Sequence, residues 1–559
     1  MITHTAAELL VLGIVAVFFQ KNRLQRIWAF LLWAGFAGIA FSWLAESLAG
    51  GDFRAVYRWI VSPVINVDLV LKNNAEVFKM TAAVFIAGGF SLFYNIFYDL
   101  EKERLRSGGL YLLLTAAMIF LICAENMMQL LIGACLADIL GFYLIRDTMS
   151  KQKYVFYNLL ADMALMLAFA LLWGKTGNLG LAAAAKFAAG GGETSLAPVF
   201  LLGAAAAKSG LFLFHNNLLD LKRVCFTRAM FVMLAGTPLA GAIILYKTYA
   251  IVAAGGWMMV PATVALAALT LLWALGGALL ADNVHAKILY LNLAVYGMLY
   301  GVLSADAAVF PALLPAAVLF GTVTTLVLML PVAAASNEVN VSGMGQFYKM
   351  MKLTLGVSLL AVWAEIPQWA GLAAGTASGQ WWIWAYGAVQ LLALAHVLGQ
   401  IYLGASRADD RVWAMLKNPN FFYLLPLLAA AGLLLVESRI MGGWPVLCAG
   451  VAFLLVFLTR PMRFLDRFYD NETVQAAEPV MAFYNAALIT PLTVLGRILW
   501  LLVDFLLIEK TFVNTLNNVV NALVRLTARI HTDVRGSGLV FTAAGLAAAA
   551  VCYYVQGGR

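Results

Sequence analysis

The chain has 559 residues, of which 63% are hydrophobic and only 11% are charged. Soluble domains carry about 25% charged residues, so this composition excludes a water-soluble globular protein and predicts an all-α polytopic membrane protein. The formal net charge of +8 could indicate nucleic-acid binding. In a membrane chain, however, basic residues more often mark cytoplasmic loops, so we expect no nucleic-acid partner.

Apolar segments long enough to cross a hydrocarbon layer of about 30 Å recur along the chain. They are too long for barrel strands and lack a period-2 alternation, so they predict helices. The first contains Glu8 and follows no basic region, which favours a retained helix over a cleaved signal. We expect about sixteen transmembrane helices, at 6–20, 27–48, 79–98, 109–124, 126–146, 155–174, 199–217, 226–253, 258–281, 286–304, 309–334, 352–373, 381–404, 420–437, 441–459 and 537–555.

The distribution of basic residues predicts the orientation of these helices. With the N-terminus outside, the loops after odd-numbered spans are cytoplasmic, and these loops hold most of the lysines and arginines. Lys21, Arg104, Lys151, Lys222 and Arg407 are examples. The opposite face holds far fewer, and several of those lie around the long loop at 49–79.

The segment 480–533 interrupts the pattern of spans. It is too long and too amphipathic for one span, because Arg497, Asp504, Glu509 and Arg525 recur among its apolar residues. We expect a long lateral amphipathic helix along the membrane surface or along other helices, followed by the last span at 537–555. A pair of short interfacial helices joined by a turn is the alternative.

Ionisable residues inside the spans are the candidate functional residues, since each costs about 3 kcal/mol or more unless it is paired or hydrated. The candidates are Lys208, Asp138, Asp162 and Glu365, with Glu125 and His215 as weaker ones. Removal from water favours the neutral form of a lysine, and a nearby carboxylate favours the charged form. A buried lysine with acidic neighbours is therefore a candidate proton-loading switch.

Each candidate also has a structural interpretation. Lys208 could be a lysine at a helix end that extends to the headgroups, although apolar residues flank it on both sides. Asp138 could serve local packing near Arg146. Asp162 could lie at the membrane interface, and His215 could be a hydrogen-bonded loop residue. We expect Glu365, two residues before Pro367, at the membrane surface.

No cofactor motif accompanies these residues. The five cysteines are scattered, without a CxxC pair or a cluster with histidine, so we expect neither an iron–sulfur nor a zinc site. No GxGxxG motif follows a predicted strand. We expect no metal, no bound cofactor and no redox chemistry in this chain.

Several stretches resemble subunit L of bacterial NADH-quinone oxidoreductase, the subunit 5 of mitochondrial complex I, in the antiporter-like family shared with Mrp-type cation antiporters. They are "AENMMQLLIGACLADILGFYLI" (124–145), "YNLLADMALML" (157–167), "AKSGLFLFHNNLLD" (207–220), "ILYLNLAVYGML" (288–299) and "SNEVNVSGMGQFYKMM" (336–351). The tail from about 477 to 555 resembles the lateral helix and final span of that family.

The resemblance implies residue roles and also shows departures. Lys208 matches the proton-carrying lysine of span seven, His215 matches the histidine beyond it, and Asp162 matches the aspartate of span six. Asn216 and Asn217, after Lys208, can meet backbone groups freed at a helix break, which predicts a discontinuous span seven. The glutamate that partners the lysine falls on Cys135, and Asp138, one turn away on the same helix face, is its candidate replacement. Span eleven, 309–334, contains no ionisable residue, and only Glu365 lies near the position of the lysine of span twelve.

The resemblance also implies an organisation into five parts: N-terminal helices (1–105), a first antiporter-like helix repeat (106–254), a second and degenerate repeat (255–404), C-terminal helices (405–479), and the lateral helix with the final span (480–559). It implies a bacterial inner-membrane location. The implied partners are other antiporter-like membrane subunits, contacted through 480–533, and peripheral electron-transfer or other energising subunits.

Three functions remain open from the sequence. The first is a proton-translocating, non-redox membrane subunit of a complex-I-type assembly. The second is a structural or coupling subunit that does not pump. The third is a membrane subunit of a related inorganic-carbon uptake or cation antiporter complex.

Overall fold

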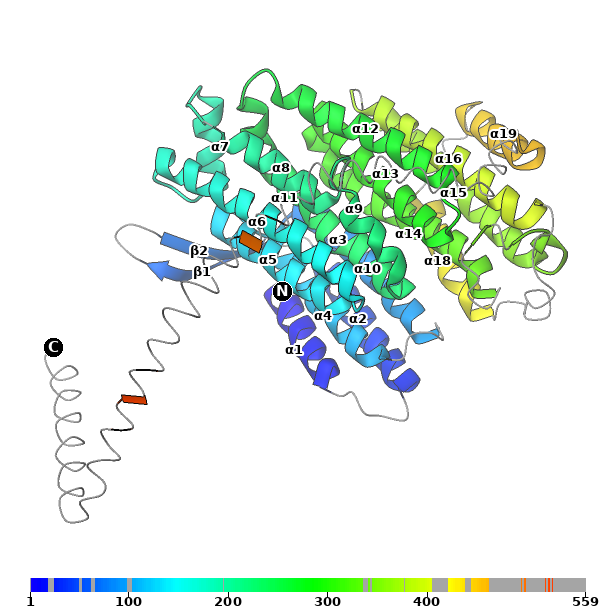
Figure 1. The fold of residues 1–559 in the computed structure, drawn as a ribbon, viewed down its shortest axis with the longest axis horizontal. Coiled ribbons are helices and arrows are strands. Elements are labelled where there is room, and N and C mark those ends of the chain that lie inside the picture. Colours follow the sequence, from blue (N-terminus) through cyan, green and yellow to red (C-terminus); the bar gives the residue numbers. More distant parts are fainter. Residues whose placement is uncertain are drawn as a thin grey trace, which may run out of the picture. The chain divides into compact units, whose positions relative to one another are not determined.

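A computed structural model of the chain describes residues 2–18, 25–49, 53–61, 66–97, 103–194, 196–334, 340–341, 344–376, 378–404, 421–437 and 444–461, with seven isolated residues between 494 and 525. The chain divides into two compact units, Met1–Asp470 and Asn471–Arg559. The elements below all belong to the first unit (Figure 1).

The described residues of the first unit form helices and one β-hairpin. Its elements are α1 (Ile2–Phe18), α2 (Gln25–Leu48), β1 (Phe53–Val61), β2 (Asn66–Asn73), α3 (Ala75–Phe97), α4 (Arg104–Ile122), α5 (Met127–Leu144), α6 (Thr148–Thr176), α7 (Leu181–Ala189), α8 (Ala197–Ser209), α9 (Asn216–Leu219), α10 (Phe226–Ala235), α11 (Thr237–Ala254), α12 (Met259–Leu280), α13 (Val284–Ala305), α14 (Phe310–Ala334), α15 (Lys352–Gly375), α16 (Gln380–Leu403), α18 (Phe421–Glu437) and α19 (Trp444–Thr459).

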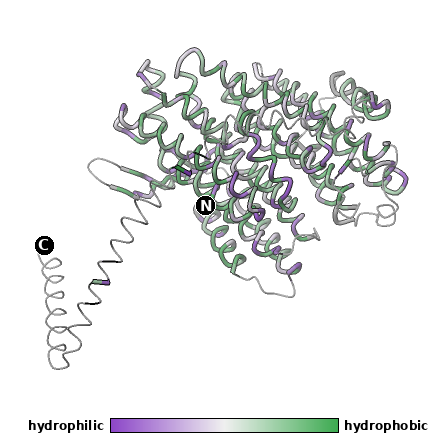
Figure 2. Tube along the Cα trace, viewed as in Figure 1, coloured by the Kyte–Doolittle hydropathy of each residue, from purple (hydrophilic) through white to green (hydrophobic). Residues whose placement is uncertain are grey.

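The helices confirm the predicted class of a multi-pass helical membrane protein. Within the described residues, eleven helices are long and apolar enough to span a membrane, and four shorter apolar helices accompany them. Hydrophobic residues run along the length of these helices in Figure 2. The predicted lateral helix at 480–533 and the predicted span at 537–555 fall outside the described residues, apart from the seven isolated positions, so the count of sixteen stays a prediction.

The predicted loop at 49–79 instead contains the β-hairpin. Strands β1 and β2 pair antiparallel, with Val56 opposite Val70. The side chain of Gln129, in the first turn of α5, accepts a hydrogen bond from the Val70 N–H at 2.9 Å and donates one to the Val70 carbonyl at 2.8 Å. Val67 and Val70 are buried. Long apolar runs do not reveal the hairpin, because its strands are short and each contains two charged residues.

The predicted discontinuity in span seven is confirmed. Helix α8 ends at Ser209, and Gly210 adopts the left-handed conformation with φ 63°. A Cβ atom at Gly210 would lie 2.2 Å from Leu218 Cδ1, so both the backbone and the packing favour glycine there. The chain then turns through Leu213, at φ 80°, into α9. The helix that contains Lys208 therefore ends directly after this lysine.

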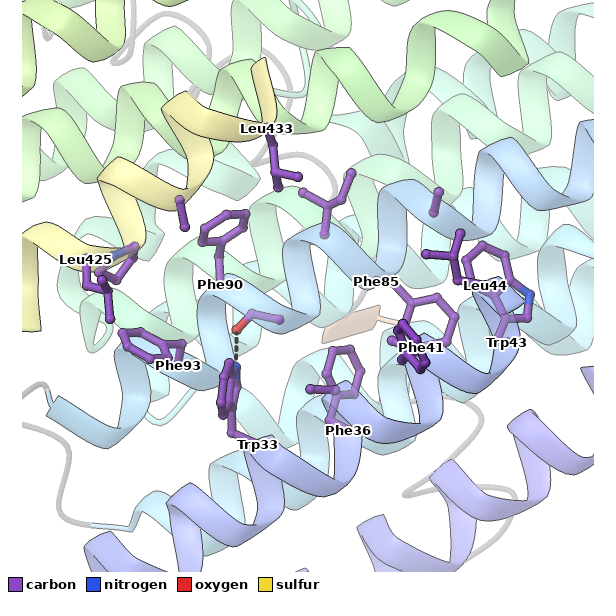
Figure 3. Close-up of a pocket in the computed structure, with 17 residues that line it drawn as sticks. Trp33, Phe36, Phe41, Trp43, Leu44, Phe85, Phe90, Phe93, Leu425 and Leu433 are labelled. Carbon is purple, nitrogen blue, oxygen red and sulfur yellow. Dashed lines mark hydrogen bonds between the residues drawn. The ribbon is translucent and has the colours of Figure 1, made fainter. Parts of the chain in front are cut away.

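An apolar cavity of about 580 Å³ lies between α2, α3 and α18 (Figure 3). Trp33 of α2, Phe90 and Phe93 of α3, and Leu425 and Leu433 of α18 line it, and the Trp33 indole N–H donates to the Gly89 carbonyl at 3.2 Å. The cavity is lined by apolar side chains and offers no titratable group. It therefore contributes nothing to the polar site described next.

Candidate proton-transfer site

Lys208 forms the centre of a buried ionic cluster. Its side chain is 0% exposed, and its Nζ lies 2.5 Å from Asp138 Oδ2 and 2.7 Å from Asp162 Oδ1. The two carboxylates are 12% and 15% exposed. The lysine is thus a buried, doubly paired residue, and the alternative of a lysine extended to the headgroups does not fit its position.

Three helices bring the cluster together. Asp138 lies in α5, Asp162 in the middle of α6, and Lys208 in the last turn of α8, where the helix dipole favours a cation. Side-chain caps fix where α5 and α6 begin: Asn126 accepts from the Gln129 N–H at 2.7 Å, and Asp147 accepts from the Ser150 N–H at 2.8 Å. Defined helix starts set which turn of each helix meets Lys208.

Small residues let α8 approach its neighbours closely. Helix α8 carries a run of four alanines, 204–207, and packs against α6 and α11 (Figure 1). On α11, a Cβ atom at Gly241 would lie 2.4 Å from Ser209 Oγ and 2.6 Å from the Ala205 carbonyl. Close helix packing of this kind depends on small side chains. It surrounds the lysine with protein rather than with lipid.

Cys135 also belongs to this cluster. Its Sγ donates to Asp162 Oδ2 at 3.4 Å, from a position one turn before Asp138 on α5. The structure therefore places Asp138 against the amine and Cys135 against the second carboxylate. That Asp138 takes over the role of the partner glutamate stays a prediction.

A second ion pair lies toward the loop between α5 and α6. Lys153 Nζ is 2.5 Å from Asp220 Oδ2, and the Asp220 side chain is only 10% exposed. Ser150 Oγ donates to the Asp220 carbonyl at 3.0 Å and lies 2.6 Å from Asp147 Oδ2. The sequence search did not single out Asp220, although its place within "FHNNLLD" after Lys208 was a usable signal.

His215 lies in the turn after α8 and not in the ionic cluster. It is 5% exposed, and its ring packs against Phe212 and Trp273, with centroid distances of 6.3 Å and 4.9 Å. The residue next to the lysine, Ser209, is bonded instead to α11 and α13. It donates to the Pro238 carbonyl at 3.0 Å and lies 2.9 Å from the Tyr300 hydroxyl.

The expectation that Glu365 lies at the membrane surface is wrong. Glu365 is 0% exposed, in the interior of α15, because this helix continues through Pro367 to Gly375. Gln390 of α16 donates to Glu365 Oε2 at 3.3 Å and also to the Thr324 hydroxyl of α14. Polar residues in otherwise apolar spans, such as Gln390 and Thr324, were the signal that could have located this second polar centre.

Glu125 lies in the turn between α4 and α5, next to the hairpin. Arg54 of β1 donates to its Oε2 at 2.7 Å, and Lys72 Nζ of β2 lies 3.0 Å from its Oε1. Burial raises the pKa of Glu125, but the hydrogen bonds from Lys72 and Arg54 outweigh burial and hold the pKa below its ordinary value. This carboxylate therefore stays ionised near neutral pH.

Comparison with known proteins gives structural neighbours only. No protein-family model and no curated protein matches the chain. The structure of the Mrp complex from Dietzia sp. DQ12-45-1b matches 99% of this chain with a TM-score of 0.64 at 18% identity, and this chain spans 63% of that one.

A second neighbour is the membrane-bound sulfane sulfur reductase, an archaeal respiratory membrane complex. It matches 79% of this chain and 76% of its own, with a TM-score of 0.65 at 14% identity. At such identities the likeness establishes the fold. The chain is a multi-pass membrane protein folded like chains of these two membrane complexes.

Proposed function

We propose that this chain is the membrane-arm, antiporter-like subunit of a complex-I-type assembly and that it translocates protons through Lys208. The observation that carries the proposal is the cluster of one fully buried amine held by two carboxylates, at the end of a broken helix. Burying such a charged group at membrane depth is costly in free energy, and groups of this kind are common in proton pathways.

The chemistry follows from the charges in the cluster. Lys208 loses its proton when its acidic neighbours are neutralised, and it regains the proton when they are ionised. Asp138 and Asp162 would set the charge of the lysine, and the Lys153–Asp220 pair would deliver protons from the loop between α5 and α6. The distribution of basic residues predicts that the loop between α5 and α6 is cytoplasmic and that the hairpin is external, in a bacterial inner membrane.

The route beyond Lys208 is less complete in the second proposed repeat. A route through that repeat would have to lead from His215 to Glu365, and Glu365 is buried with Gln390. Helix α14 contains no ionisable residue between them. Protons would need water along this stretch.

The proposed partners are other antiporter-like membrane subunits, contacted through 480–533, and energising peripheral subunits. A cation antiporter complex is the second candidate assembly, favoured by the likeness to the Mrp complex chain. In that setting the same cluster would exchange a proton against a metal cation. A non-pumping structural subunit would keep Lys208 in a fixed ion pair.

The test is Lys208→Met in membrane vesicles that contain the assembled complex. We expect proton uptake to fall at least tenfold while the complex still assembles. Lys175→Met is the matched control, because Lys175 is 46% exposed and pairs only loosely with Glu193 at 3.5 Å. Wild-type uptake in an assembled Lys208→Met complex would leave only the structural function.

A further inference from the structure

A second group of titratable side chains lies where the hairpin meets α3, α11 and the turn between α4 and α5. We name Arg54, Lys72, Glu76, Glu125 and Lys247 the hairpin cluster. Lys247 of α11 donates to the Ala124 carbonyl at 3.0 Å, directly before Glu125. The neighbouring Tyr246 donates to Glu76 Oε1 at the start of α3. Four separate segments of the chain thus bring ionisable groups to one place.

Helix α11 runs from the level of Lys208 toward the hairpin cluster. Gly241 of α11 packs against Ser209, the residue after Lys208. Lys247 follows Gly241 by six residues, which is about 9 Å along a helix. Lys247 is therefore the next amine beyond Lys208 in the direction of the hairpin.

Exposure within the hairpin cluster increases toward the hairpin. The side chains of Lys72, Glu125 and Arg54 are 20%, 30% and 61% exposed, respectively. Lys247 is only partly accessible, and its ammonium group has three donors, of which one meets the Ala124 carbonyl. The arrangement leads from a largely enclosed amine, past a carboxylate, to an exposed guanidinium.

The turn that carries Glu125 is held firmly. Leu181 N–H donates to the Glu125 carbonyl at 3.0 Å, the Asn126 side chain donates to the Asp68 carbonyl, and Gln129 bonds both polar groups of Val70. Cys123 Sγ donates to the Lys72 carbonyl at 3.3 Å. These bonds fix the Glu125 carboxylate relative to Lys72 and to the end of the Lys247 side chain.

We propose that the hairpin cluster is the release end of the proton path that begins at Lys208, with Lys247 as the proton acceptor and Glu125 as the carboxylate that stabilises its charged form. The first proposed repeat, 106–254, together with the hairpin, then contains a complete path across the membrane. Protons leave on the hairpin side and do not cross to Glu365. The proposal rests on the function proposed for Lys208.

In this path Lys247 takes a proton from Lys208 through intervening water and returns it to water beside Glu125. No covalent bond forms, and each transfer moves one proton between amines and water. Glu125 stabilises the ammonium form of Lys247 as it accepts the proton. Arg54 and Lys72 limit that stabilisation, since they already neutralise the carboxylate.

The experiment compares Lys247→Met, Lys247→Arg and Glu365→Gln in vesicles with the assembled complex. We expect both Lys247 variants to lower proton uptake at least tenfold, because methionine carries no proton and arginine does not release one. Glu365→Gln should retain more than half of the wild-type uptake. Lys79→Met is the control, since Lys79 is exposed on α3 one turn from Glu76.

The outcomes separate this proposal from the function it rests on. Wild-type uptake in an assembled Lys247→Arg complex, with Lys208→Met inactive, would overturn the hairpin path and keep Lys208 as a proton carrier. Loss of uptake in Glu365→Gln as deep as in Lys208→Met would also overturn it, because protons would then leave through the second repeat. Wild-type uptake in Lys208→Met would refute both. If Lys247→Met does not assemble, Lys247→Arg preserves the charge and decides the question.

Discussion

Asp138→Asn removes the shorter of the two ion pairs of Lys208 and tests whether this carboxylate sets the charge of the lysine. At 2.5 Å, the attraction between the two charges is roughly 6–7 kcal/mol at an effective dielectric constant of about 20. Desolvation offsets part of this, and breaking a buried pair costs about 3–5 kcal/mol in measured cases. Asp162 still pairs with the amine at 2.7 Å, so we expect the lower end of that range.

A change of about 3 kcal/mol in the free energy of the charged lysine corresponds to roughly a 100-fold change in a rate that depends on it. We therefore expect Asp138→Asn to lower proton uptake into energised vesicles about 100-fold, with normal assembly. Fluorescence quenching of a pH-sensitive dye measures the initial rate of proton uptake. Glu193→Gln is the control, since the Glu193 carboxylate is 82% exposed.

A second substitution sharpens the test. Cys135 lies one turn before Asp138 and contacts Asp162, so a glutamate at 135 has the reach to meet the amine. We expect Asp138→Asn with Cys135→Glu to recover uptake to within tenfold of the wild type. Uptake by Asp138→Asn equal to the wild type would refute the assigned role of Asp138. Failure of the double variant to recover would show that the carboxylate must approach from position 138.

Further predictions concern the break, the hairpin and its carboxylate. Gly210→Ala should abolish uptake or assembly, because the new Cβ atom would lie 2.2 Å from Leu218 Cδ1 and residue 210 has a φ of 63°. Gly203→Ala within α8 is the control: its Cβ atom would have nothing within 4 Å, so proton uptake and thermal stability should not change. Gln129→Ala removes both bonds to Val70 and should destabilise the hairpin by about 1–3 kcal/mol, seen as faster hydrogen exchange at 66–73; unchanged exchange would contradict this anchor. Because the pKa of Glu125 is held below its ordinary 4.5, its ion pairs should persist above that pH and be lost as the pH falls through the lowered value; hydrogen exchange of the hairpin, corrected for its intrinsic rate, should then rise, and Glu125→Gln should remove the transition.

The class of fold could be predicted from the composition, and the centre of the site from the position of an ionisable residue inside an apolar span. A chain with 63% hydrophobic residues has to lie in a membrane, and an ionisable group such as Lys208 inside a span has to find a partner. The sequence offered Asp138 and Asp162 as partners, and both lie at the amine. The need for an acidic partner followed from the free-energy cost of burying an unpaired lysine.

The remaining parts depend on helix register and on contacts between distant segments. Pro367 suggested an exposed position for Glu365, but α15 continues past this proline, and the Glu365 carboxylate is buried beside Gln390. The hairpin cluster joins Arg54, Glu125 and Lys247, which are far apart in the chain. No local pattern reveals such a meeting, because it is set by how α11 packs beside α5 and the hairpin.

Under the proposed proton translocation, the charge balance of the Lys208 cluster indicates which of its groups would receive an incoming proton. With both acids ionised, one ammonium and two carboxylates leave a net charge of −1, which a proton or a metal cation would neutralise. The amine is fully enclosed, whereas both carboxylates retain some exposure. A cation that arrives from outside the cluster therefore meets Asp138 or Asp162 before it meets Lys208. Its arrival weakens the hold on the ammonium proton and frees that proton to move on. Loading of the acids and unloading of the lysine would thus be one linked event, whether the arriving cation is a proton or a metal ion.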